Sequence, residues 1–405
     1  MQPVAAPGQP VNRGPASRGT RAARGRWIWA VSGVCTLVVL AGLGTAAVLR
    51  ASRPDFGGQS ESARPTRTVT IGQPVTSVSV ASYGAPIRVF RGPVGHVTVT
   101  EAIRYSRLAG LPRVTAAVSG GALTLDAPAC ENSGCSVGFT VAVPASVAVT
   151  ASSQGGGISV TGAGTAALDS GGGPLTADGI QGALSATSES GSVSVRGAGS
   201  ASIDSGGGPV TVNDVPGTLS VNADSGSVYV NGSGPASLDS GGGPVTAIAV
   251  LGALTVNSDS GSINVADAQG AQLDSGGGPV VARAIDGPLT VSSDSGTVRV
   301  SELSGTLDAD TGGGPCNASD VTAPTARVNT DGGTARLVFA RAPQSVQVTT
   351  GGGTGIVVLP GGPYAVTASP GGGPEVLTVP ENPAASATIS ISTDGGAIQV
   401  TPAGG

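Results

Sequence analysis

Acidic residues that recur beside glycine runs are the side chains of this sequence with the clearest potential for chemistry. An Asp-Ser-Gly-Gly-Gly-Pro motif repeats every 35 residues, and a looser Asp-Thr-Gly-Gly-Gly-Pro copy follows one residue late. Its acidic residues are Asp169, Asp204, Asp239, Asp274 and Asp310. Carboxylates repeated among glycines are typical of calcium-binding solenoids, which supply many oxygen ligands per turn. Here one acid precedes each glycine run. We therefore interpret the five as turn residues that hydrogen-bond their own backbone, and we expect no metal or other cofactor; calcium is the alternative.

A second acidic motif alternates with the first. It reads Glu-Ser-Gly or Asp-Ser-Gly and begins at Glu189, Asp224, Asp259 and Asp294, again 35 residues apart. The spacing between the two motifs alternates between 20 and 15 residues, so each unit of 35 contains two related half-units. Internal repetition on this scale is a signature of stacked repeat architectures.

Residue types needed for most catalytic sites are scarce. His96 is the only histidine, and all 20 basic residues are arginines. The absence of lysine excludes a P-loop lysine and a Schiff base, and a single histidine leaves no histidine pair for zinc. A net charge of −5 gives no overall attraction to nucleic acid. We therefore expect a protein that is not an enzyme and has no nucleic-acid partner, with His96 as an ordinary strand residue.

The four cysteines occur in three settings. Cys130 and Cys135 flank four residues, and outside a membrane this pair is expected to form a disulfide; two free thiols are the alternative. Cys35 lies in an apolar run, where it is one more small apolar side chain. Cys316 follows a Gly-Gly-Gly-Pro run, at a position where the other units have valine or leucine. We therefore expect a buried thiol there.

An uncharged apolar run at residues 27–49 is long enough to cross a bilayer as a helix, which takes about 20 residues. Residues 1–26 contain five arginines and no acid, and positive charge at that end favours a cytoplasmic N-terminus. We predict a flexible arginine-rich cytoplasmic tail at 1–26, one transmembrane helix at 27–49, a polar linker at 50–67 and an extracytoplasmic repeat domain at 68–405. A cleaved signal peptide is the alternative interpretation of the apolar run.

The repeat domain is expected to be all-β. Runs such as Pro209–Asn213 and Ser227–Asn231 alternate apolar and polar residues, which places successive side chains on opposite faces of a strand. Gly, Pro, Asn and Asp gather between the runs and indicate turns. One half-unit contains too few aliphatic side chains to offset the entropy of ordering it. We therefore predict a β-solenoid, a stack of coils with two strands and two turns each, whose flanking regions are degenerate versions of the same coil.

The pattern resembles a known family. The features that carry the resemblance are Val143-Pro144, the following run Val147–Thr150, and the succession of coils up to about residue 310. They are similar to the DUF4097 family of β-strand-repeat proteins, often labelled adhesins, over roughly residues 68–400. The resemblance implies a bacterial envelope protein and no defined enzyme activity or ligand. The arginine-only basic composition indicates a GC-rich genome, of actinobacterial type.

We expect a non-enzymatic protein, held in the cell membrane by a single pass, whose extracytoplasmic solenoid offers an adhesin-like surface to a cell-wall polymer or an envelope protein. That expectation comes from the resemblance. The alternative is a cell-envelope stress sensor or regulator whose N-terminal tail meets a cytoplasmic partner. Deleting residues 1–26 should abolish signalling and leave adhesion intact if topology is retained.

Overall fold

The computed structural model describes residues 64–105, 111–127 and 135–404. The chain divides into two units, Met1–Ala46 and Ala47–Gly405, and all described residues belong to the second. The predicted tail at 1–26 and transmembrane helix at 27–49 lie outside the described residues, as does most of the linker. Within the described ranges, no helix has the length and apolarity needed to cross a bilayer.

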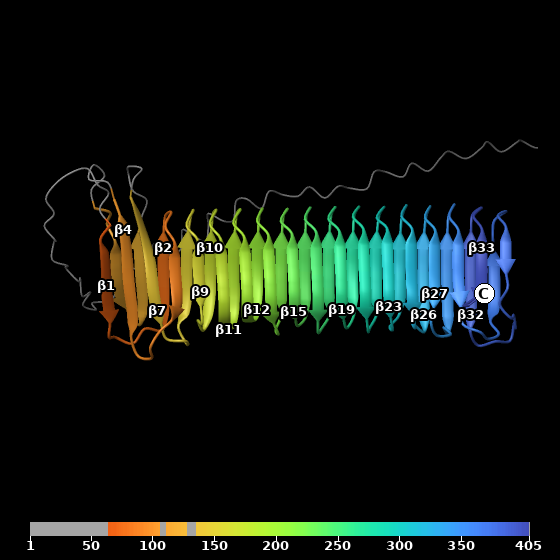
Figure 1. The fold of residues 1–405 in the computed structure, drawn as a ribbon, viewed down its shortest axis with the longest axis horizontal. Coiled ribbons are helices and arrows are strands. Elements are labelled where there is room, and N and C mark those ends of the chain that lie inside the picture. Colours follow the sequence, from red (N-terminus) through yellow and green to blue (C-terminus); the bar gives the residue numbers. More distant parts are fainter. Residues whose placement is uncertain (1–63, 106–110, 128–134, 405) are drawn as a thin grey trace, which may run out of the picture. The chain divides into compact units, whose positions relative to one another are not determined.

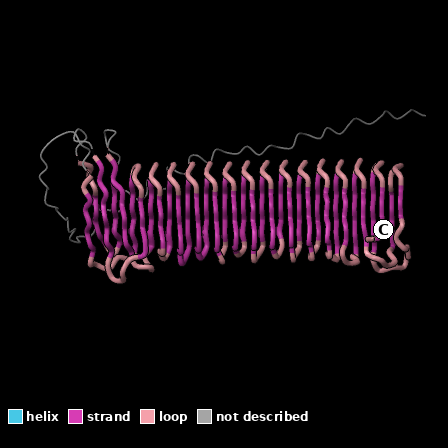
Figure 2. Tube along the Cα trace, in the orientation of Figure 1, coloured by secondary structure: helices cyan, strands magenta, loops and turns pink. Residues whose placement is uncertain are grey.

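The second unit is built from strands that stack side by side along one axis (Figures 1 and 2). One coil consists of β14 (Leu219–Ala223) and β15 (Val228–Ser233), and the next consists of β16 (Ala236–Ser240) and β17 (Val245–Val250). β14 pairs in parallel with β16, and β15 pairs in parallel with β17. A coil is therefore two strands and two turns and occupies half of a 35-residue unit, which confirms the predicted β-solenoid.

Coil-to-coil pairing produces two sheets that face each other. The first sheet contains, in spatial order, β5 (Thr115–Ser119), β6 (Ala122–Ala127), β2 (Ser77–Ser82), β8 (Ala148–Ser153), β10 (Thr165–Ser170), the C-terminal halves of β11 (Leu175–Ser188) and β12 (Val193–Ser205), β14, β16, β18 (Leu254–Ser258), β20 (Ala271–Ser275), β22 (Leu289–Ser293), β24 (Leu307–Thr311), β26 (Thr325–Thr330), β28 (Ser345–Thr350), β32 (Thr388–Thr393) and β30 (Ala365–Ser369).

The second sheet contains, in spatial order, β1 (Thr66–Ile71), β4 (Val97–Arg104), β7 (Ser136–Val143), β3 (Ile87–Arg91), β9 (Ile158–Thr161), the N-terminal halves of β11 and β12, β13 (Val210–Val215), β15, β17, β19 (Ile263–Ala268), β21 (Val280–Ile285), β23 (Val298–Leu303), β25 (Cys316–Val321), β27 (Ala335–Phe339), β29 (Gly355–Leu359), β33 (Ile398–Pro402) and β31 (Glu375–Leu377).

The core is a thin layer of aliphatic side chains between the two sheets. In β14 and β16 the residues alternate buried and exposed, and Val221 and Leu238 occupy equivalent inward positions in successive coils. Both are almost fully buried. Because parallel strands place equivalent residues next to each other, each inward position becomes a column that runs along the whole stack.

The ends of the stack depart from the simple succession of coils. At the C-terminal end, the last coil in sequence, β32 and β33, is inserted between the coil of β28 and β29 and the coil of β30 and β31. At the N-terminal end, β2 and β3 are inserted in the same way between β6 and β7 on one side and β8 and β9 on the other. Each end therefore includes a strand pair that is held on both sides.

The N-terminal flank is also more than the degenerate coil that the sequence suggested. Three of its pairings, β1 with β4, β4 with β7, and β5 with β6, are antiparallel. These antiparallel strands cover the strand edges that would otherwise continue to pair with another coil. In addition, β1 begins at Thr66, two residues before the expected start of the domain.

From β9 to β25, each coil has one residue in the left-handed region of φ, at or near the end of its segment in the second sheet. Glycine occupies this position in several coils, including Gly197 and Gly232. In others it is Asp214, Ala249, Asp267, Ala284, Glu302 or Asp320, with φ between 52° and 56°. A side chain at such φ costs about 1 kcal/mol. The paired strands on both sides hold the turn in this conformation.

Ser233 is a buried polar residue in an otherwise apolar column. Its neighbours in the coils before and after are Val215 and Val250, and its hydroxyl has no hydrogen-bond partner among the described residues. We predict that Ser233→Ala raises the free energy of unfolding by about 1 kcal/mol, because the desolvation cost of an unpaired hydroxyl is removed. Urea unfolding of residues 47–405 measures this change.

Ser205 supplies the matched control for Ser233. It is equally buried, but its Oγ donates a hydrogen bond of 3.0 Å to the carbonyl oxygen of Gly208. Ser205→Ala should therefore lower the free energy of unfolding by about 1 kcal/mol. Equal effects of the two substitutions would contradict the assignment of Ser233 as unsatisfied.

Candidate functional site

The glycine-rich turns at one edge of the stack are closed by buried hydroxyl groups. In the Asp-Ser-Gly-Gly-Gly-Pro motif, the serine Oγ donates to the carbonyl oxygen of the third glycine, at 2.8 Å from Ser240 to Gly243. Equivalent bonds recur along the stack, from Ser170, Ser188, Ser205, Ser258, Ser275, Thr311, Thr330 and Thr350. Ala223 interrupts this series in one coil.

The aspartates of the motif have a different position from the one expected. Each is the next-to-last residue of a strand rather than part of the turn, and its side chain is on the exposed face. This corrects the expectation that Asp169, Asp204, Asp239, Asp274 and Asp310 close the turns, since the following serine or threonine does so. The reason is the alternation of the strand, which directs adjacent side chains to opposite faces.

The motif aspartates form one outward-facing column of the first sheet, and neutral side chains separate them. Asp204 pairs across the strands with Thr187 on one side and Asn222 on the other, so the nearest carboxylate of the same column is two coils away. Two strand spacings correspond to roughly 9–10 Å. Asn222 Nδ2 donates to Asp204 Oδ1 at 3.4 Å, and Asn329 Nδ2 donates to Asp310 Oδ1 at 3.2 Å. The column is therefore partly paired by amide donors from neighbouring coils.

The acidic residues of the second motif form another row, which lies in the turns and runs beside the column of motif aspartates. We call the two rows together the acidic edge: Asp169, Glu189, Asp204, Asp224, Asp239, Asp259, Asp274, Asp294 and Asp310, all of them exposed. Partial burial, and then the charge of Glu189, raise the pKa of Asp169. Among residues 64–105, 111–127 and 135–404, no three His, Cys, Asp or Glu side chains come close enough together to hold a metal ion.

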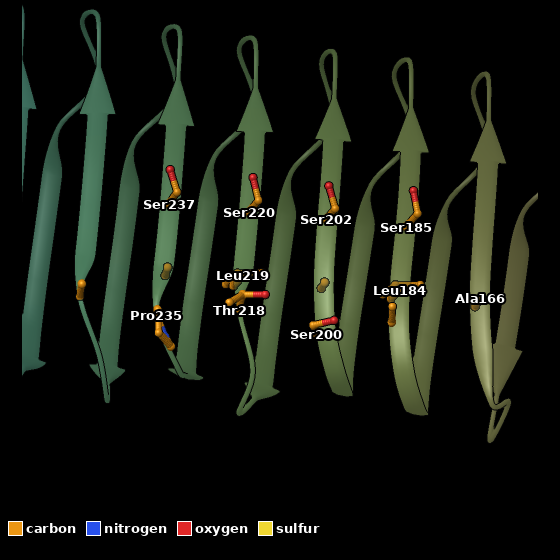
Figure 3. A pocket seen from close by; sticks show the side chains of 14 residues that line it. Ala166, Leu184, Ser185, Ser200, Ser202, Thr218, Leu219, Ser220, Pro235 and Ser237 are labelled. Carbon is orange, nitrogen blue, oxygen red and sulfur yellow. The ribbon is translucent and has the colours of Figure 1, made fainter. Parts of the chain in front are cut away.

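A shallow groove of about 630 Å³ lies on the outer surface of the first sheet (Figure 3). Four exposed serines from successive coils form a row along it: Ser185, Ser202, Ser220 and Ser237. A second row of small residues lies two positions before the serine row and its continuation at Thr255: Ala183, Ser200, Thr218, Pro235 and Ala253. The remaining lining residues are Ala166, Leu184, Ala201, Leu219 and Ala236. Because both rows have short side chains, the surface is hollowed there and carries hydroxyl groups in register with the coils.

The hollow continues beyond this groove. A second depression of about 430 Å³ shares Ala253 with the first and extends over the next coils, where Thr255, Gln272 and Thr290 take the place of the serines. The residues that line the two depressions include neither a charged nor an aromatic side chain. We call the two depressions together the serine groove. Its chemistry is that of a neutral surface with hydrogen-bonding hydroxyls at regular intervals.

The serine groove was not predicted from the sequence. Its signal was present, since the outward positions of the first sheet repeat as serine in four consecutive coils. The more conspicuous acidic motif lies on the same strands, where Asp204 and Asp239 follow Ser202 and Ser237 by two residues.

The remaining residues singled out from the sequence lie apart from both surfaces. His96 is half-buried and stands directly before β4, not within a strand as expected. Cys135 is disulfide-bonded. Its expected partner, Cys130, lies outside the described residues, as does Cys35, so the pairing stays a prediction.

Cys316 is a free, buried thiol at the start of β25. Burial raises its pKa to about 12, so the thiol stays protonated at neutral pH. Since the thiolate is the reactive form, we predict that a thiol reagent labels Cys316 only after unfolding. Labelling of residues 47–405 in which Cys130 and Cys135 are both replaced by serine checks this, because Cys316 is then the one cysteine present. Rapid labelling in native buffer would contradict the burial.

Comparisons with known proteins give weak similarities. Neither a family of known proteins nor a curated protein matches the chain. Among solved structures, one named a putative adhesin from Parabacteroides distasonis shares 11% identity, with 84% of this chain and 98% of that chain covered and a TM-score of 0.20. Another so named, from Parabacteroides merdae, shares 13% identity, with 73% and 95% covered and a TM-score of 0.22.

A third solved structure is named a putative lipid binding protein from Parabacteroides distasonis, with 11% identity, 82% and 96% covered and a TM-score of 0.21. Similarities with TM-scores this low do not carry an argument about function. The fold and the proposed function therefore rest on this chain's own residues. Membership of the DUF4097 family stays an expectation from the sequence.

Proposed function

We propose that this chain is an adhesin-like protein of the cell envelope that is not an enzyme and binds a neutral wall polymer along the serine groove. The observation that carries the proposal is the register of the groove: Ser185, Ser202, Ser220 and Ser237 present one hydroxyl per coil on an uncharged surface. A polymer that runs along the stack would meet the same donor and acceptor at every coil spacing of about 4.8 Å. Many weak contacts then add along the polymer.

The acidic edge supports a neutral ligand. Asp204 and Asp239 follow Ser202 and Ser237 by two residues on the same strands, and Glu189 and Asp224 lie in the turns that follow Ser185 and Ser220. Polyanions such as nucleic acids are repelled by such a row, whereas an uncharged, hydroxyl-rich polymer is not. The absence of aromatic side chains from the groove favours a flat polymer bound through hydroxyl groups over single sugars stacked on rings.

Anchoring in the membrane is the second part of the proposal. The apolar run at 27–49 and the arginines at 1–26 support a single membrane pass with a cytoplasmic N-terminus and an extracytoplasmic solenoid. A chain with an N-terminal tag should remain in the membrane pellet after alkaline carbonate extraction. Release of the chain, or a mature N-terminus after Ala47, would contradict the anchor.

Binding is tested by sedimentation of residues 47–405 with purified, insoluble cell wall. We expect the wild-type unit to sediment with the wall, and Ser202→Arg to reduce binding because its long side chain fills the groove. The matched control is Ser194→Arg, an exposed serine of the same strand, β12, on the opposite sheet. Equal binding of the two variants would contradict the groove as the binding surface.

A further inference from the structure

Basic and exposed apolar residues gather at the N-terminal end of the second unit. Residues 64–113 contain six of the twelve arginines in the described residues, and the one acid among them is Glu101. Four of the seven large apolar side chains that are exposed in the described residues also fall here: Tyr83, Phe90, Val94 and Leu111. From Asp169 onward the balance reverses, with 20 acids and six arginines.

Arginines and exposed apolar side chains lie close together on β3 and on the loop that follows it. Arg88 and Phe90 point outward from β3, Arg91 ends the strand, and Val94 stands on the following loop. Phe90 is 45% exposed and Val94 is 90% exposed. We call these four residues the basic apolar patch.

The surroundings of the patch are uncharged. Arg88 lies between Thr140 of β7 and Ser159 of β9, and Phe90 lies between Ala142 and Thr161 of the same strands. Glu101 is the one acidic residue in the second-sheet strands from β1 to β9, and it is buried. The first exposed acid along the Phe90 row is Asp178, two coils further on.

We propose that the basic apolar patch rests on an anionic lipid surface, with Arg88 and Arg91 on headgroup phosphates and Phe90 and Val94 at the level of the acyl boundary. The membrane's proximity rests on the anchor in the proposed function. Only 16 residues, 50–65, separate the predicted membrane helix from β1, and a chain of that length spans at most about 58 Å when fully extended. The patch is therefore held at high effective concentration near the bilayer, so a weak affinity is sufficient.

The distribution of charge along the stack determines which end of the second unit faces the lipid surface. An anionic bilayer attracts exposed arginines and repels carboxylates within about a Debye length of 8 Å. The end of the unit with the patch is thus drawn to the surface, whereas the acidic edge and the serine groove beside it are kept away from the lipid. The groove would then stay accessible to a wall polymer.

The test is sedimentation of residues 47–405 with vesicles, which does not depend on the anchor. This unit contains all the described strands and their core. We expect binding to vesicles of equal parts phosphatidylglycerol and phosphatidylcholine, little binding to phosphatidylcholine alone, and weaker binding as salt is raised. Arg88→Ala with Arg91→Ala should lower the partition coefficient roughly 25-fold, at about fivefold per arginine.

Arg299→Ala with Arg336→Ala is the matched control. These two exposed arginines occupy the same outward column as Arg88, many coils away. Their loss should leave vesicle binding unchanged. Equal binding to both lipid compositions, or equal loss in the two double variants, would overturn the proposal. A failure of the anchor would be seen separately, as release of the full chain by carbonate.

Discussion

Gly243→Ala should strongly destabilise the stack, whereas the same change one residue earlier, at Gly242, should be tolerated. A Cβ on Gly243 would overlap the backbone carbonyl of Gly226 in the preceding coil and would lie 2.9 Å from the carbonyl oxygen of Ser225. These are backbone atoms fixed by the strand ladder, so they cannot move aside as a flexible side chain could. We expect the free energy of unfolding to fall by about 3 kcal/mol or more.

Gly242 provides a control in the same turn. The atom nearest to a Cβ at this position would be the Oγ of Ser260, 3.9 Å away, which is ordinary van der Waals contact. Gly242→Ala should therefore change the free energy of unfolding by no more than about 1 kcal/mol. Urea unfolding of the two variants, followed by circular dichroism, makes the comparison. Similar destabilisation by both would show that turn flexibility, and not the distance between coils, requires glycine.

Leu238→Asp should be the most damaging single change in the core. Leu238 has no exposed surface and sits in the inward column between Val221 and Val256. The substitution removes a buried aliphatic side chain and places a carboxylate where no partner is available. We expect the free energy of unfolding to fall by about 5 kcal/mol or more.

Ser237→Asp is the control for Leu238→Asp and tests whether β16 has one buried face and one exposed face. Ser237 is the preceding residue of the same strand and is exposed on the other face, so a carboxylate there keeps its water. Its effect on stability should be within about 0.5 kcal/mol. A large loss from both substitutions would mean that β16 is not arranged with one face in the core and one in solvent.

The alternation of side chains allowed the coils to be predicted from sequence. In β13 and β15, Val210, Val212, Val228 and Val230 are buried, as the period of two requires. The position of the motif aspartate could have been predicted in the same way. Ala166, Leu168 and Ser170 share the inward face of β10, so Asp169 between them has to point outward.

The order of the strands at the two ends could not be predicted from the pattern. β28, β30 and β32 have the same alternation, so any of them could stack on another, and nothing local specifies that β32 lies between the other two. The left-handed residues were equally hidden, because Ala249 and Glu302 carry no turn signal of their own. Their conformation is imposed by the strands on both sides, which is an interaction between coils and not a local preference.

The central claim is that one coil, or a pair of coils, is too weak to fold alone and is stable only as part of a longer stack. It is tested by comparing residues 47–405, the same unit with residues 219–253 deleted, and the isolated 35-residue segment 219–253. The deletion joins Thr218 to Leu254 in register, since Leu219 and Leu254 occupy equivalent inward positions two coils apart. We predict that the shortened unit unfolds cooperatively with a lower free energy of unfolding, and that the isolated segment has no cooperative transition. A cooperative unfolding transition of the isolated segment would contradict the account.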